Sequence, residues 1–156
     1  MNESIVKETN EMEVVFDAIS ENEGFARVAV AAFITGLNPT LEEISDVKTA
    51  VSEAVTNAII HGYAGKRKKE DGESNKVYLR CRISDNCIWV CVEDRGIGIE
   101  DVKRAMEPLY TTKPELERSG MGFAFMEAFM DNVQVYSRVG EGTRVMMEKT
   151  LGKDAE

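Results

Sequence analysis

The sequence contains few of the residues on which redox and zinc enzymes depend. Its 156 residues include one histidine, one tryptophan and three cysteines. The cysteines, Cys81, Cys87 and Cys91, lie close together but have neither the C-x-x-C spacing nor the spacing of zinc ligands. We therefore expect buried, reduced thiols and a location in a reducing cytoplasm.

Positive charge and long apolar runs are also scarce. There are 19 lysines and arginines against 28 acidic residues, a net charge of −9. Such a surface repels a phosphate backbone, so direct binding of nucleic acid is not expected. No apolar run approaches the ~18 residues that span a membrane. The polar start of the sequence does not resemble a signal peptide.

The residues that are present favour one globular domain over 1–156. Hydrophobic residues make up 43% of the chain, enough for a single core. Residues 1–10 are expected to be frayed, and 12–19 read as a strand. Asn22 is expected to cap a helix that ends near Thr35. Its apolar face is predicted to comprise Phe25, Val28, Ala29, Ala32 and Phe33.

The strongest local signal in the sequence marks the start of the next helix. Thr40 and Glu43 have the spacing of a capping box. An apolar stripe follows at steps of three and four residues, which predicts a helix packed on a sheet as far as 61–62. The stripe comprises Ile44, Val47, Val51, Ala54 and Ala58.

The remaining elements complete an α+β pattern. Strands are predicted at 77–83 and 88–92 with a turn at Asp85–Asn86, and at 133–137 and 143–149. Short helices are predicted at 101–106 and 120–130. The order predicts a two-layer α/β sandwich, with a mixed sheet and helices on one face.

Four segments carry candidate chemistry. On the long helix, Glu53, Asn57 and His61 recur every four residues and therefore share a face. A carboxylate beside an amide oxygen can handle a proton and a hard cation. Taken alone, this spacing is more typical of a solvated helix face.

The second segment, Asp94-Arg95-Gly96-Ile97-Gly98, directly follows a strand. A carboxylate there can accept the exocyclic N–H of adenine, whereas guanine would present an oxygen. Gly96 and Gly98 would let the backbone approach a flat base. Without further context, the same residues could form a plain turn.

The other two segments adjoin each other. Ser119-Gly120-Met121-Gly122-Phe123 opens a helix, where backbone N–H groups suit phosphate oxygens. It matches neither a P-loop nor a complete dinucleotide-binding turn. The preceding 108–119 is polar, contains two prolines and suits a lid, in which Lys113 and Arg118 could place charge near a terminal phosphate.

The order of these segments resembles the Bergerat fold of GHKL ATPases, which includes histidine kinases. Within that superfamily, SEAVTNAIIHGY (52–63) and PLYTTKPELERSGMGF (108–123) are similar to the sporulation anti-sigma F factors. The resemblance runs from about residue 12 to 151. The basic loop GKRKK (65–69) is longer than the family's. A histidine kinase acting on another chain is disfavoured by the missing acceptor domain and by the lid.

The resemblance implies a role for each motif residue. Glu53 would be the general base and Arg118 the lid arginine, a contact to the γ-phosphate or to a partner. Asn57 would coordinate Mg²⁺ and Asp94 would bind adenine. Arg27 matches a partner-binding residue of the family, although the sequence alone favours a merely exposed arginine. The remaining nucleotide contacts would be His61, Gly96, Gly98, Thr111, Thr112, Lys113, Ser119, Gly120, Met121, Gly122, Phe123 and Thr143.

The resemblance also implies function and partners. It predicts a homodimer that binds ATP or ADP, inhibits a sigma factor of the sigma F type and phosphorylates an anti-anti-sigma factor on serine. The alternative is a module whose sigma binding is gated by nucleotide with little kinase turnover. A general base at Glu53 separates the two, because a pure binding module has no need of one.

Overall fold

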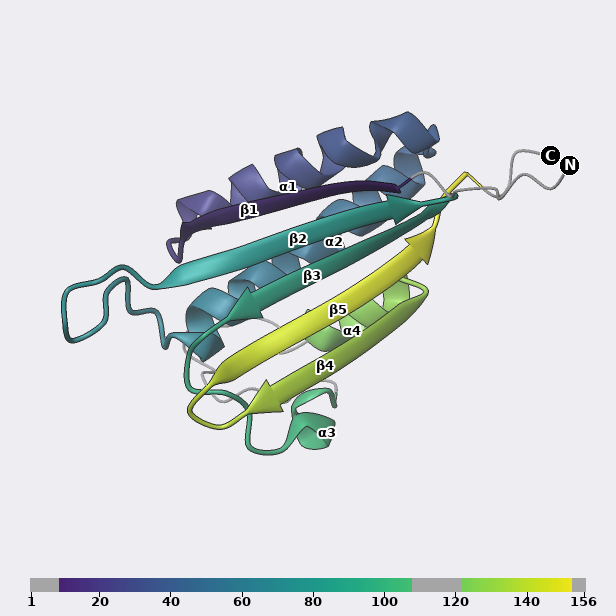
Figure 1. Ribbon diagram of the computed structural model, residues 1–156. Helices are drawn as coiled ribbons and strands as arrows, with labels where there is room; N and C mark the ends of the chain where they lie inside the picture. The colour runs from purple at the N-terminus through teal and green to yellow at the C-terminus, as the bar shows by residue number, and fades with distance from the viewer. Residues whose placement is uncertain (1–8, 108–121, 153–156) are drawn as a thin grey trace, which may run out of the picture.

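The computed structural model describes residues 9–107 and 122–152. These residues form a five-stranded sheet that is covered on one face by helices (Figure 1). The strands are β1 (Thr9–Asp17), β2 (Lys76–Ser84), β3 (Cys87–Asp94), β4 (Asn132–Arg138) and β5 (Gly142–Thr150). The helices are α1 (Glu21–Ile34), α2 (Leu41–Asn57), α3 (Val102–Ala105) and α4 (Gly122–Phe129). Short helical turns follow α1 (Thr35–Leu37) and α2 (Ala58–Gly62). The predicted two-layer α+β sandwich is confirmed.

The expected mixed sheet is wrong in one respect, because every neighbouring pair of described strands is antiparallel, in the order β1-β2-β3-β5-β4. Two helices connect β1 to β2, so the chain reverses three times, before α1, between the helices and after α2, and the two strands run in opposite directions (Figure 1). β3 and β4 do run parallel, since both are antiparallel to β5. β5 lies between them, so no parallel pair forms.

Helix α2 forms as its sequence predicts and anchors the second layer. The Thr40 hydroxyl accepts from the Glu43 N–H at 3.0 Å, and the Glu43 carboxylate accepts from the Thr40 N–H at 2.9 Å, which completes the capping box. The stripe is buried from Val47 to Ala58, and Ile44 packs against it half-buried. After Asn57 the helix widens into a π-helical turn, a feature that often accompanies functional sites.

Helix α1 packs through a different face from the predicted one. Ala26, Val30 and Ile34 are buried, whereas Phe25 is 50% and Val28 is 63% exposed. The helix begins after Ser20, and the Asn22 side chain donates to the Asp17 carbonyl instead of capping. Both apolar stripes have helical spacing, so the sequence alone could not choose between them.

The strands alternate between the two faces of the sheet. In β2, Val77, Leu79 and Cys81 point toward the helices and are buried. The β2–β3 turn is Asp85–Asn86 as predicted, with Asp85 at a φ of +54°. Cys81, Cys87 and Cys91 are free thiols, and burial raises the pKa of Cys81 to about 12. No helix among the described residues is long and apolar enough to cross a membrane.

Candidate functional site

A cavity of about 640 Å³ opens where α2, α4 and the ends of β3 and β5 meet. This volume falls in the range of small-molecule sites. Seven of the predicted nucleotide-site residues line the cavity: Asn57, His61, Asp94, Gly98, Gly122, Phe123 and Thr143. The fold therefore gathers residues from segments that lie far apart in the sequence.

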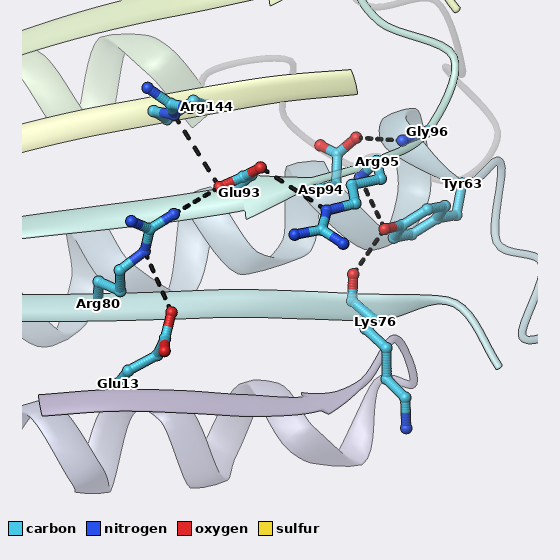
Figure 2. A network of polar contacts seen from close by, with 9 residues as sticks. All are labelled: Glu13, Tyr63, Lys76, Arg80, Glu93, Asp94, Arg95, Gly96 and Arg144. Atoms are coloured by element: carbon cyan, nitrogen blue, oxygen red, sulfur yellow. Dashed lines mark hydrogen bonds and ion pairs between the residues drawn. The ribbon is translucent and has the colours of Figure 1, made fainter. Parts of the chain in front are cut away.

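Asp94, the last residue of β3, is the buried carboxylate of the cavity. It is 4% exposed, and one carboxylate oxygen accepts from the Gly96 N–H at 2.9 Å (Figure 2). Burial raises the pKa of Asp94 to about 6, while the hydrogen bonds from the Gly96 and Thr143 backbones oppose that rise. The ionised side chain is thus a hydrogen-bond acceptor in a poorly solvated place, which suits an N–H donor on a ligand.

Close backbone packing around Asp94 requires glycine. A Cβ on Gly62 would lie 2.5 Å from Cγ of Asp94, and one on Gly96 would overlap the Gly62 carbonyl oxygen. Gly142 has a φ of +116°, and a Cβ there would overlap the Asp94 carbonyl oxygen. Gly62 therefore approaches the carboxylate, and Gly96 and Gly142 approach neighbouring backbone, more closely than any larger residue permits.

The loop after Asp94 is held from both sides. The Ile97 N–H donates to the Gly62 carbonyl at 2.9 Å, and the Ile97 carbonyl accepts from the Gly140 N–H at 2.8 Å. Gly98 has a φ of +80°, and a Cβ there would overlap the Arg138 carbonyl. The glycine loop is therefore joined both to the end of α2 and to the β4–β5 turn.

Thr143 belongs to a small hydroxyl network at the start of β5. Its Oγ1 lies 2.8 Å from Oγ of Ser137 on β4. The Ser137 hydroxyl also donates to the Gly142 carbonyl at 3.0 Å and accepts from the Ile99 N–H at 2.7 Å. This network fixes the strand next to Asp94.

The opposite side of the cavity is formed by α2 and α4. Asn57 and His61 line it one turn apart, and Gly122 is the first residue of α4. Backbone N–H groups at a helix start can receive phosphate oxygens. Glu53 lies one turn before Asn57 and does not line the cavity. Arg27, on α1, pairs with Glu23 and lies outside the cavity lining.

Several predicted residues lie outside the described ranges. They are the lid 108–119 with Thr111, Thr112, Lys113, Arg118 and Ser119, and the neighbouring Gly120 and Met121. Sequence reasoning, for its part, missed Gly62, Ser137 and Arg104, a cavity-lining arginine on α3. A glycine directly after His61, at the end of a long helix, was the available signal for Gly62.

The donor set fits a magnesium ion that is held mainly by a nucleotide. Among the described residues, no group of three His, Cys, Asp or Glu side chains could hold a metal. Mg²⁺ characteristically takes one or two protein ligands together with phosphates and water. The Asn57 side-chain oxygen, on the cavity wall, can supply one of these ligands.

Comparison with known proteins places the chain in a family. The model for the histidine kinase-like ATPase domain matches residues 18–149. An anti-sigma F factor of Clostridium perfringens is 58% identical over 91% of this chain and 97% of its own. One from Oceanobacillus iheyensis is 54% identical over 92% and 94%.

A solved structure supports the fold. The RsbU and RsbW domains of a Mycobacterium tuberculosis protein match with a TM-score of 0.64 at 19% identity. That match covers 91% of this chain and 32% of the other. The chain thus belongs to the histidine kinase-like ATPase family and, within it, to the anti-sigma F factors.

Proposed function

We propose that this protein is an ATP-dependent serine kinase that also binds and inhibits a sigma factor of the sigma F type. The observation that carries the proposal is the single cavity that joins Asn57, Asp94 and the start of α4 in a member of this ATPase family. These residues supply what ATP needs: an acceptor for the base, a metal ligand and N–H groups for phosphates.

Asp94 would recognise adenine. Its buried carboxylate accepts the exocyclic N–H of adenine, whereas guanine carries a carbonyl oxygen at that place. Two acceptors facing each other in a poorly solvated site repel, so the cavity would select ATP over GTP. Thr143 and Gly98, which line the same part of the cavity, would support the base.

Glu53 would act as the general base of phosphoryl transfer. It takes the proton from a serine hydroxyl while that oxygen forms a bond to the γ-phosphorus and the bond to the ADP oxygen breaks. Asn57 would hold Mg²⁺, which neutralises phosphate charge when bound. Lys113 and Arg118 would stabilise the γ-phosphoryl group from a lid over 108–119.

The protein partners follow from the relatives. Because the curated relatives are named anti-sigma F factors, we propose a sigma factor as one partner and an anti-anti-sigma factor as the serine substrate. Arg27 would contact a partner. The exposed apolar face of α1, with Phe25 and Val28, offers a surface for a homodimer. Whether ATP or ADP is bound would decide, through the lid, which of the two protein partners the chain binds.

One observation favours a second candidate function. Glu53 does not line the cavity, so the chain could bind nucleotide and gate sigma binding with little turnover. Equal sigma-factor affinity with ATP and with ADP would contradict the gating in both candidate functions.

The test is phosphate transfer from Mg-ATP to the anti-anti-sigma protein, with the native chain and Glu53→Gln. We expect phosphoserine with the native chain and a loss of at least about a hundredfold in the variant, while ATP affinity is retained. If the native chain transfers no phosphate but binds the sigma factor in an ATP-dependent way, the gated module is the correct function.

A further inference from the structure

Tyr63 joins two backbone segments at the edge of the nucleotide site. It follows the π-helical turn at the end of α2 and is 6% exposed. Its hydroxyl donates to the Lys76 carbonyl at 2.6 Å and accepts from the Arg95 N–H at 2.7 Å (Figure 2). The second bond fixes the peptide that joins Arg95 to Asp94.

The hydroxyl lies where the ladder between β2 and β3 stops. The ladder pairs Val77 with Asp94, so the next pair in that register would be Lys76 with Arg95. There the Tyr63 hydroxyl stands between the carbonyl and the N–H that a ladder would join directly. It therefore satisfies both groups while letting the chain leave the sheet as the glycine loop.

The neighbouring Gly62 reinforces the same loop. Its α-carbon lies against the Asp94 carboxylate, and its carbonyl accepts from the Ile97 N–H at 2.9 Å. Residues 62 and 63 thus hold the segment from Asp94 to Ile97 at three points: a side chain and two backbone N–H groups. The end of α2 and the carboxylate cannot shift independently.

The Arg95 side chain secures the loop from the open face of the sheet. Its guanidinium stacks on the Tyr78 ring, 4.0 Å from the centroid, and lies 3.9 Å from the Glu93 carboxylate. Burial raises the pKa of Tyr63 to about 12, so its hydroxyl stays protonated and keeps donating at neutral pH.

We propose that Tyr63 is a positioning residue for the nucleotide site, whose hydroxyl fixes the Asp94–Arg95 peptide and so aims the Asp94 carboxylate into the cavity. The inference rests on the proposed adenine contact of Asp94. It predicts that removing the hydroxyl weakens recognition of the adenine amino group more than binding of the rest of the nucleotide.

The experiment compares the affinities of ATP and purine riboside triphosphate, which lacks the exocyclic amine, by calorimetry on the full chain. We expect the native chain to prefer ATP by about tenfold or more, as one charge-assisted hydrogen bond provides. Tyr63→Phe should reduce the preference to about threefold or less. Because both ligands bind the same folded molecules, partial unfolding leaves this ratio unchanged.

Tyr78→Phe is the matched control, because it also loses a hydroxyl but keeps the ring beneath Arg95 and leaves the Tyr63 bridge intact. It should keep the native preference. A native preference retained in Tyr63→Phe would overturn the positioning role alone. No preference in the native chain would contradict the adenine contact, and the inference with it.

A second measurement needs no variant. Arg95 is exposed to solvent. Protection of its backbone amide from hydrogen exchange therefore reports on the hydrogen bond that this amide donates to the Tyr63 hydroxyl. We expect the Arg95 amide to exchange at least about a hundredfold more slowly than an unbonded amide. Exchange at the unprotected rate would overturn the inference.

Discussion

Asp94 and Glu93 are neighbours on β3 whose carboxylates lie on opposite faces of the sheet. Asp94 points toward the helices and has backbone N–H groups as partners. Glu93 points to the open face, where Arg80 lies at 2.8 Å and Arg144 at 4.0 Å (Figure 2). One carboxylate is left for a ligand, whereas the other is neutralised by arginines.

This difference suits Asp94 to the proposed binding role and Glu93 to a structural one. A buried carboxylate without a cation is costly, and that cost is recovered when a ligand donates to it. A carboxylate among exposed arginines contributes little stability and has little capacity left for a ligand. Charge type alone does not distinguish the two, but the face of the sheet does.

The largest effect is expected from filling the space beside Asp94. In Gly96→Ala the new Cβ overlaps the Gly62 carbonyl, so backbone must move, and the free energy of unfolding should fall by about 3 kcal/mol. Gly36→Ala is the control, because a Cβ there meets nothing within 4 Å. Denaturant unfolding measures both. Equal stabilities would contradict the close packing.

A direct comparison exchanges each carboxylate for its amide. Asp94→Asn should weaken ATP binding by about a hundredfold, because a charged acceptor is lost where water is scarce. Glu93→Gln should change the affinity by less than about threefold, since its partners are arginines of the sheet. Calorimetric titration gives both values. Similar losses of ATP affinity in the two variants would show that the two faces of the sheet do not differ in their effect on ATP binding.

The raised pKa of Asp94 predicts a pH dependence. The folded pKa of about 6 exceeds the ordinary 3.8, so the folded chain binds more protons between these values. The free energy of unfolding should therefore fall, on the order of 2 kcal/mol, as pH rises from about 4 to 6, and this contribution should be constant above.

The test compares denaturant unfolding of the native chain and Asp94→Asn across that pH range. The difference between their free energies of unfolding should change with pH, and ATP affinity of the native chain should fall about tenfold from pH 7 to 5, as the carboxylate is protonated. A difference that stays constant with pH would mean that Asp94 titrates as an ordinary carboxylate.

The smallest effect belongs to the open face. Arg80 pairs with Glu13 at 3.3 Å and with Glu93 at 2.8 Å, but its side chain is 51% exposed. Arg80→Gln should therefore lower the free energy of unfolding by at most about 1 kcal/mol, less in high salt, and leave ATP affinity unchanged. A large loss of affinity would connect the open face to the nucleotide site.

Local signals predicted much of the fold. The capping box of Thr40 and Glu43 acts within one helical turn, so sequence alone located the start of α2. The direction of the sheet could not be predicted in this way, because the insertion of β5 between β3 and β4 depends on pairing between distant segments. The wrong face of α1 came from two equally periodic apolar stripes.

The candidate site, like the fold, could be predicted from the sequence only in part. Asp94 was predicted because its glycine motif directly follows a strand. Gly62 and Tyr63 were missed because they act through backbone contacts with 94–97, a segment more than 30 residues away that only the fold brings near. Ser137 was missed for the same reason.

The most direct test of the account is the affinity of the native chain for ATP against GTP, measured by competition at neutral pH. We expect at least about a tenfold preference for ATP, because in the proposed contact the Asp94 carboxylate would accept from the adenine amine and would repel the guanine carbonyl. Equal affinities would contradict the assignment of Asp94 as the residue that recognises the base.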